Sequence, residues 1–188
     1  MQAAEGSKIR QLFEREERDF MLTRARVKMR APLENIEVGE FKIAGVSEGE
    51  RAEFPRWVAE ELVKLGLAEM EEEPFENEIF RAVTREKMYA SPQLSTLNPE
   101  FYIRMRRRLS IIGEGVESGK TRREDYERLK SSCYDLIGRR LSKLLSLSSS
   151  MTSLETLGDK VTPEEREFFL LCQSISKEWK SALLGEWI

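Results

Sequence analysis

The stretch YERLKSSCYDLIGRRLSKLLSL, residues 126–147, decides the fold that the sequence predicts. Its apolar side chains recur at intervals of three and four residues, so they lie on one side of a helix. This wide stripe consists of Tyr126, Leu129, Cys133, Leu136, Ile137, Leu141, Leu144 and Leu145. The other side of the helix carries Arg128, Lys130, Asp135, Arg139, Arg140 and Lys143. The pattern predicts a long amphipathic helix that buries its stripe against neighbouring helices.

Two further helices are predicted, one before and one after this stretch. The first starts at Asn98-Pro99, because asparagine can accept from free backbone amides and proline is tolerated at the first helical position. Its apolar face contains Phe101 or Tyr102, then Met105, Leu109 and Ile112. The second starts at Thr162-Pro163-Glu164-Glu165, which has the pattern of a capping box. Its stripe contains Phe168, Cys172, Ile175, Trp179 and Leu183.

A different periodicity precedes these helices. From Arg24 to Arg30 apolar and basic residues alternate, which predicts a half-buried strand with Ala25, Val27 and Met29 inside. Short strands follow at residues 36–38, 41–43, 52–54 and 67–70. The helix after Pro55 has Trp57 or Val58, then Leu62 and Leu65, on its buried side and is expected to stop at Gly66.

The chain therefore divides into four parts. Residues 1–23 form an arm or short helix, 24–73 a small β-rich module, 74–97 a linker or connecting helix, and 98–188 a helical assembly domain. The predicted fold class is mainly α, with a C-terminal helical bundle preceded by a small α+β module. The closing residues Trp179, Leu184, Trp187 and Ile188 are apolar, and we expect them to dock on this domain or on a partner.

The composition bounds the function. The 188 residues are 40% apolar and 35% charged with a net charge of −3, as in a core-forming protein that has no general attraction for nucleic acid. No apolar run approaches the roughly 20 residues that cross a bilayer, and residues 1–18 lack the apolar segment of a secretion signal. We expect an intracellular, cytoplasmic protein that binds no membrane.

The sequence offers little material for catalysis or metal binding. It contains no histidine, which is the commonest general base and metal ligand. Cys133 and Cys172 lie on the stripes of two helices, and we expect two buried thiols, with an interhelical disulfide as the alternative. The pair Glu164 and Glu165 is explained by its place at a helix start. We expect no enzyme activity, no cofactor and no metal.

One segment has a superficial likeness to a phosphate-binding loop. Residues 113–121, GEGVESGKT, end like the Gly-x-x-x-x-Gly-Lys-Thr motif, but the residue that must be the first glycine is Glu114. The segment also follows a helix rather than a strand, and its glutamates would repel phosphate. We interpret it as a flexible loop between helices.

A basic cluster supports two interpretations. Its members are Arg104, Arg106, Arg107 and Arg108, together with Arg122 and Arg123 beyond the loop. The first interpretation is a solvated face or a surface for an acidic partner. The alternative is a DNA- or RNA-binding regulatory surface driven by counterion release, although no recognition-helix or aromatic-strand signature accompanies the arginines.

The order of these parts resembles a subunit of the GINS DNA replication complex. The resemblance rests on three stretches, which together span residues 24–184. The first stretch is the β-rich module, with the segments VKM (27–29), IEVG (36–39), PRWVAEEL (55–62) and GLA (66–68). LNPEFY (97–102) opens the helical domain, and RRLSKLL (139–145) precedes VTPEE (161–165) with Phe168-Phe169. The β-rich module comes first, as in the archaeal type related to the second and third eukaryotic subunits.

This resemblance implies a non-enzymatic scaffold. GINS subunits assemble through their helical domains, usually as a 2:2 heterotetramer with a paralogous subunit. The complex links and activates the MCM helicase with a RecJ/Cdc45-like partner, and it contacts primase or DNA polymerase; DNA contact is weak or indirect, and the protein would be nucleoid-associated. We expect the subunit interface at Phe101, Tyr102, Tyr126, Leu129, Cys133, Leu136, Phe168, Phe169, Cys172, Ile175 and Trp179.

Overall fold

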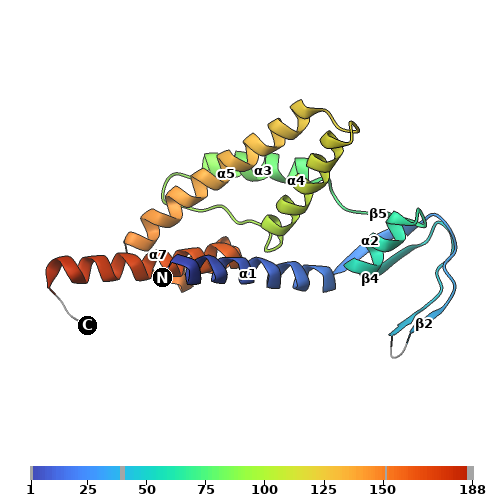
Figure 1. The fold of residues 1–188 in the computed structure, drawn as a ribbon, viewed down its shortest axis with the longest axis horizontal. Coiled ribbons are helices and arrows are strands. Elements are labelled where there is room, and N and C mark those ends of the chain that lie inside the picture. Colours follow the sequence, from blue (N-terminus) through green and yellow to red (C-terminus); the bar gives the residue numbers. More distant parts are fainter. Residues whose placement is uncertain (1, 39–40, 151, 186–188) are drawn as a thin grey trace. The chain divides into compact units, whose positions relative to one another are not determined.

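The computed structural model describes residues 2–38, 41–150 and 152–185, and the chain separates into two compact units, residues 1–73 and 74–188 (Figure 1). The mainly-α prediction is confirmed, since helices make up most of the described residues. The described strands all belong to the first unit. Its elements in chain order are α1 (Gln2–Leu22), β1 (Arg24–Met29), β2 (Ile36–Val38), β3 (Phe41–Ile43), β4 (Arg51–Pro55), α2 (Arg56–Lys64) and β5 (Ala68–Met70).

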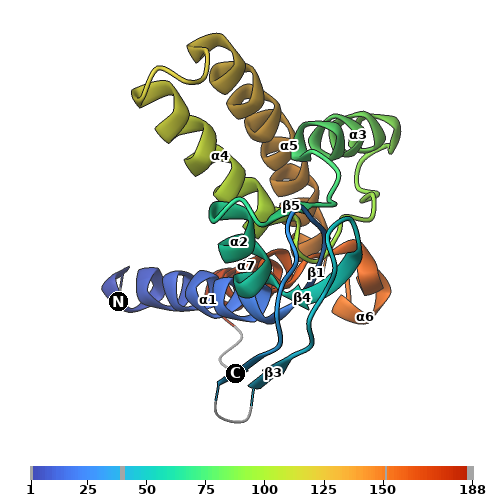
Figure 2. The same cartoon turned by 90° about the vertical axis from the view of Figure 1, so that its right-hand side faces the viewer.

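The first unit is built on an antiparallel sheet with the strand order β4-β1-β5. The alternation in β1 has the predicted effect: Ala25, Val27 and Met29 are buried, whereas the basic residues between them are exposed. Strands β2 and β3 pair as a separate hairpin, which Figure 2 shows extending beyond the three-stranded sheet. The buried side of the sheet packs against Val58, Ala59 and Leu62 of α2.

Helix α2 ends as its sequence predicts. Gly66 has a φ of 74°, which a residue with a side chain adopts only at a cost. The amide of Gly66 donates to the carbonyl of Val63, and that of Leu67 donates to Leu62, at 3.0 and 2.9 Å. This is the hydrogen-bond pattern of a Schellman cap. Of the alternatives Trp57 and Val58, the structure buries Val58, and it buries Leu62 as predicted. The prediction is wrong for Leu65, which is exposed.

The arm predicted for residues 1–23 is a continuous helix, α1, that contacts α2. Phe20 near its end is buried, and the guanidinium carbon of Arg56 lies 4.1 Å from the centre of its ring. Such a cation–π contact stabilises by about 0.5–2 kcal/mol. The last turn of α1 is therefore attached to the module rather than separate from it.

The elements of the second unit, in its described residues, are all helices or helical turns, joined by connecting segments. Of the two alternatives for residues 74–97, a linker or a connecting helix, the structure has a helix at residues 75–88, and its Phe75, Ile79 and Ala82 enter the hydrophobic core. Residues 89–100 connect it to the next helix. The elements are α3 (Phe75–Met88), α4 (Phe101–Glu117), α5 (Arg123–Ser149), α6 (Leu154–Leu157), the 3-10 turn η1 (Gly158–Lys160) and α7 (Pro163–Leu184).

The two predicted helix starts have different outcomes in the structure. Helix α4 begins at Phe101, after a turn in which the Asn98 side chain accepts from the Glu100 amide at 3.0 Å. Asn98 thus caps a turn and not the helix itself. At the start of α7 the capping box is present as predicted: the Glu165 amide donates to Thr162 Oγ1 at 3.3 Å, and the Thr162 amide donates to Glu165 Oε2 at 3.1 Å.

The segment with a likeness to a phosphate loop is largely helical. Helix α4 continues to Glu117, so only residues 118–122 form the loop that we expected over 113–121. The amides of Gly119 and Lys120 donate to the carbonyls of Val116 and Gly115, at 3.1 and 2.8 Å, and close another Schellman cap. Gly119 therefore ends a helix, with a φ of 71°.

The core of the second unit has two parts along α5. Leu129, Cys133 and Leu136 pack with α3 and α4, while Leu144 packs with Leu94, Leu157 and Phe169 around the start of α7. Figure 2 shows α5 between α3 and α4. The stretch predicted to decide the fold therefore belongs to both parts of the core.

Candidate assembly surface and the charge network beneath it

A network of buried charged side chains lies between the two parts of this core. Arg140 of α5 is fully buried and donates five hydrogen bonds. Its Nη2 donates to Glu165 Oε2 at 2.6 Å, and its Nε donates to the other oxygen of the same carboxylate. Its Nη1 and Nη2 also donate to Glu86 Oε2 (2.9 Å), to the Ser95 carbonyl (2.8 Å) and to the Lys160 carbonyl (2.7 Å).

Glu86 of α3 is the second centre of this network. Lys143 Nζ donates to its Oε1 and Ser95 Oγ donates to its Oε2, both at 2.6 Å. Burial alone raises the pKa of Glu86, but the hydrogen bonds from Lys143 and Ser95 and the charge of Arg140 outweigh burial and lower that pKa below its ordinary value. Glu86 is thus a carboxylate with well-matched donors inside the protein.

The capping residue of α7 belongs to the same network. Besides Arg140, Glu165 accepts from the hydroxyl of Tyr102 on α4 at 2.7 Å. Burial, and then the charge of Glu165, raise the pKa of Tyr102 well above its usual value, so the hydroxyl stays protonated and donates. The network therefore connects four helices: α3, α5 and α7 contribute the two acids and the two bases, and α4 contributes the Tyr102 hydroxyl. These hydrogen bonds fix how the four helices are aligned.

Sequence reasoning missed this network. The helical pattern places Arg140 and Lys143 opposite the apolar stripe, yet both are buried. One signal was present: Phe75, Ile79, Ala82 and Glu86 all lie on the buried face of α3, so this face contains an acid where an apolar residue is expected. An acid on a core face requires a buried cation as its partner.

Five residues of the predicted subunit interface lie inside this unit. Phe101, Leu129, Cys133, Leu136 and Phe169 are buried in the chain's own core, which corrects their assignment as partner contacts. A side chain already surrounded by its own core has no surface to offer another subunit. Tyr102, Tyr126, Phe168 and Cys172 are half-buried, whereas Ile175 and Trp179 are exposed.

The exposed part of the prediction lies on the second half of α7. Ile175, Trp179 and Leu183 recur every four residues on one side of α7 and are 62%, 66% and 67% exposed, and Leu184, about 100° further around the helix, is 71% exposed. We call these four residues the α7 stripe. Large apolar side chains grouped in this way on one helix are typical of interaction surfaces. Trp187 and Ile188, which were expected to continue the surface, lie outside the described residues.

The contacts of α7 explain why its two halves differ. Gln173 Nε2 donates to the Thr152 carbonyl at 3.0 Å, and Lys180 Nζ donates to the Ser149 carbonyl at 2.7 Å. Both acceptors lie at or just beyond the end of α5, which stops at Ser149. The first half of α7 buries Phe169 against Leu144 of α5, whereas Ile175, Trp179 and Leu183 of its second half are exposed beyond the point where α5 ends.

The two cysteines are both free, so the alternative disulfide is not formed, and the expected burial is found for Cys133 but only in part for Cys172. Cys133 is buried, and burial raises the pKa of its thiol to about 11. Cys172 on α7 is half-buried, and burial raises its thiol pKa as well. Neither thiol has the lowered pKa of a nucleophile.

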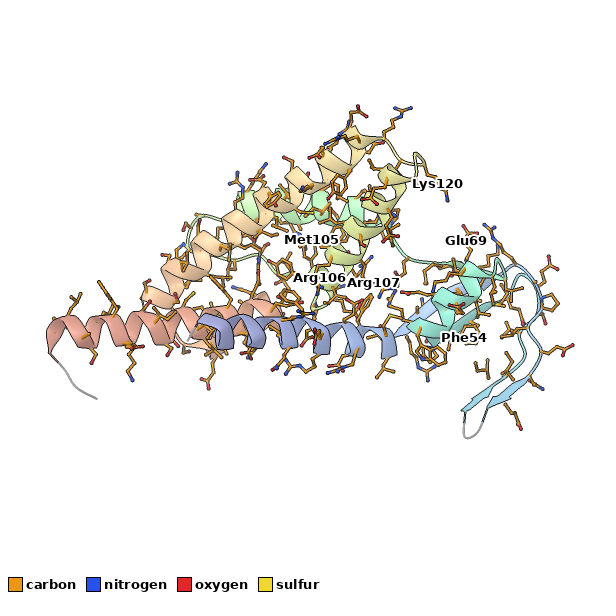
Figure 3. All side chains as sticks on the ribbon, viewed as in Figure 1. Phe54, Glu69, Met105, Arg106, Arg107 and Lys120 are labelled. Atoms are coloured by element: carbon orange, nitrogen blue, oxygen red, sulfur yellow. The ribbon has the colours of Figure 1, made fainter. Side chains whose placement is uncertain are left out.

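The structure separates the predicted basic cluster into two groups. Arg104 forms an ion pair with Glu78 at 2.6 Å, and Arg108 donates to Glu76 at 2.8 and 2.6 Å, so both arginines bind α3 to α4. Figure 3 shows Arg106 and Arg107 on the first half of α4, and Lys120 in the loop at the other end of this helix. The exposed Arg122 and Arg123 follow that loop, on the order of 16 Å along α4 from Arg106.

Metal-binding clusters and membrane-spanning helices are both absent from the described residues. No group of three or more acids or cysteines there is arranged to hold a metal ion. None of the described helices combines the length and apolarity needed to cross a membrane. Comparisons of the sequence with known protein families and with curated proteins give no match.

Proposed function

We propose that this chain is a non-enzymatic scaffold subunit of the GINS type. In this role it assembles with a paralogous subunit, in a 2:2 heterotetramer, and links an MCM helicase to a RecJ/Cdc45-like partner during DNA replication. The alternative, a nucleic-acid-binding regulator, would use the exposed Arg122 and Arg123, because Arg104 and Arg108 are occupied by acids of α3.

One observation carries this proposal. The α7 stripe exposes four large apolar side chains on a helix whose first half is firmly placed by the core and the capping box. Burial of such surface yields about 25 cal/mol per Å², and a tryptophan alone buries about 150–250 Å². A partner helix that covers Trp179 and Leu183 would therefore gain several kcal/mol.

Two further features support the same function. Residues in the stretches that carry the GINS resemblance stabilise the fold of the second unit. Leu97 and Phe101 are core residues, and residues 161–165 form the start of α7. The second unit is also rigidly joined by its charge network, so the α7 stripe is presented on a fixed frame. Rigid presentation lowers the entropy cost of association.

Light scattering coupled to gel filtration tests this proposal. We expect an assembly of about four subunits when the chain is mixed with a candidate paralogue, retained at high salt because apolar burial drives it. Trp179→Glu and Leu183→Glu should weaken assembly by at least about 30-fold, the size of an interface hot spot. Ser174→Glu places the same charge on the opposite, exposed side of α7 and should leave the assembly intact.

The same samples distinguish the alternative. A chain that remains a monomer with every candidate, and whose affinity for DNA falls steeply between low and moderate salt, would be a nucleic-acid binder and not a scaffold. In that case Arg122→Gln/Arg123→Gln should remove DNA binding. An assembly unaffected by Trp179→Glu and Leu183→Glu would refute the role of the α7 stripe.

A further inference from the structure

A groove among α3, α4 and α5 is a second candidate surface, separate from the α7 stripe. It encloses about 490 Å³, within the range of about 300–1,000 Å³ for ligand-sized pockets. Its floor is formed by Ile79 of α3, Ile112 of α4 and Leu129 of α5, which are all buried. All of the residues that line it belong to the second unit.

The groove has apolar walls as well as an apolar floor. Phe80 on α3 and Ile111 on α4 line it and are 72% and 57% exposed. A single exposed apolar residue is common on protein surfaces, but two large ones beside three buried aliphatic residues make a continuous patch. The patch could accept more than one apolar side chain of a partner.

The charged residues of the groove differ in their pairing. Arg108 is held by Glu76, because its Nε and Nη2 both donate to Glu76 Oε1, whereas Glu76 Oε2 is buried and accepts no hydrogen bond in the described part of the chain. Asp125 and Arg128 also line the groove, lie about one turn apart on α5 and are exposed. In the described part of the chain, neither has an ion-pair partner. The groove therefore offers one acid and one base at a fixed spacing.

We propose that this groove binds an amphipathic helix of a partner protein, with a base opposite Asp125 and an acid opposite Arg128. The walls are helices, whose backbone groups are hydrogen-bonded internally, so an extended peptide would find no strand edge to pair with. A helix satisfies its own backbone and presents apolar residues at intervals of three and four. Its acid and base, one turn apart, match the spacing on α5.

A peptide-display selection tests the shape of this ligand. The probe is a library of 20-residue helix-forming peptides, selected on the wild-type protein and depleted on the Phe80→Ser/Ile111→Ser variant. We expect enriched peptides with apolar residues at helical spacing and an acid and a base one turn apart, binding the variant at least about tenfold more weakly. Enriched peptides without this spacing, or with equal affinity for the variant, would overturn the proposal.

A charge exchange tests the proposed pairing of Asp125 and Arg128 with a base and an acid of the ligand. The Asp125→Lys/Arg128→Glu protein should prefer an enriched peptide whose acid and base are exchanged, whereas the wild type prefers the original, measured by fluorescence anisotropy. An unchanged preference would overturn the assignment. The control exchange, Arg123→Glu/Glu127→Lys, lies on the other side of α5 and should not alter binding.

Thermal melts identify any variant that fails to fold; both wall positions are exposed, so we expect native melting. If light scattering shows self-association that Phe80→Ser/Ile111→Ser removes, the groove contacts a second copy and the proposal is wrong. This test is independent of the proposed assembly function, because it changes no residue of the α7 stripe. Failure at the groove would leave the α7 result unaffected.

Discussion

Substitution of Arg140 by methionine should be one of the most damaging single changes in the second unit. It removes five hydrogen bonds and changes the buried set Arg140, Lys143, Glu86 and Glu165 from neutral to a net charge of −1. Removing one partner of a buried ion pair costs about 3–5 kcal/mol, because the remaining charge is left in a medium that solvates it poorly. This is a large share of the roughly 5–15 kcal/mol that stabilises a typical domain.

Urea denaturation followed by far-ultraviolet circular dichroism measures this loss, at one fixed protein concentration. Arg139→Met is the matched control: the neighbouring residue on α5 pairs with Asp135 at 2.8 Å on the surface. Such surface pairs contribute about 0.3–0.5 kcal/mol. If Arg140→Met and Arg139→Met lower the free energy of unfolding equally, the buried network does not hold the unit together.

The pH dependence of this variant gives a second readout. Without Arg140, one of the interactions that lower the pKa of Glu86 is lost and burial raises that pKa. A group whose pKa rises in the folded state stabilises the fold as pH falls. The free-energy deficit of Arg140→Met should therefore shrink as pH falls from neutral toward the unfolded pKa of about 4.3, and a deficit that is constant with pH would contradict this explanation.

Three further predictions concern single sites. In the wild type the pKa of Glu86 is lowered, so the stability that this carboxylate contributes is present above the unfolded pKa of about 4.3 and is lost as pH falls through the lower folded pKa. The free energy of unfolding of Glu86→Gln should therefore fall less steeply with acid than that of the wild type. An equally steep fall would be evidence against this role of Glu86. Cys172 should react with iodoacetamide faster than Cys133, whose thiol is buried with a pKa of about 11; peptide mass spectrometry after short exposure would reveal equal labelling if this is wrong. Gly66→Ala should destabilise the first unit by about 1–2 kcal/mol because alanine is strained at a φ of 74°, whereas an unchanged urea midpoint would mean that the turn relaxes.

The sequence predicted the parts of the fold that depend on local rules. The alternation of β1, the capping box at Thr162 and the stop at Gly66 each result from residues a few positions apart. Local patterns did not show where α4 ends, because Gly113 and Gly115 suggested a loop although the helix continues through them.

The candidate surface was only partly predictable, for a physical reason. Phe168, Cys172, Ile175 and Trp179 form one periodic stripe, yet its first half is partly covered and its second half is exposed. Periodicity reports which side of a helix is apolar, not how far the neighbouring helix extends. Here that depends on the end of α5 at Ser149. The groove at Phe80 could not be predicted from local patterns either, because it forms only where three helices pack together.

The position of Arg140 has a consequence for how the bundle selects a single alignment. Leu136, Arg140 and Leu144 follow one another at intervals of four on α5, so a slide of this helix by one turn would place a leucine against Glu86 and Glu165. The apolar surfaces alone would tolerate that slide, because the leucines are interchangeable in size. The displaced state would leave two carboxylates without their guanidinium. Arg140 thus selects one alignment of α5 against α3 and α7. An alignment displaced by one turn is electrostatically unfavourable, because it leaves buried carboxylates without a cation.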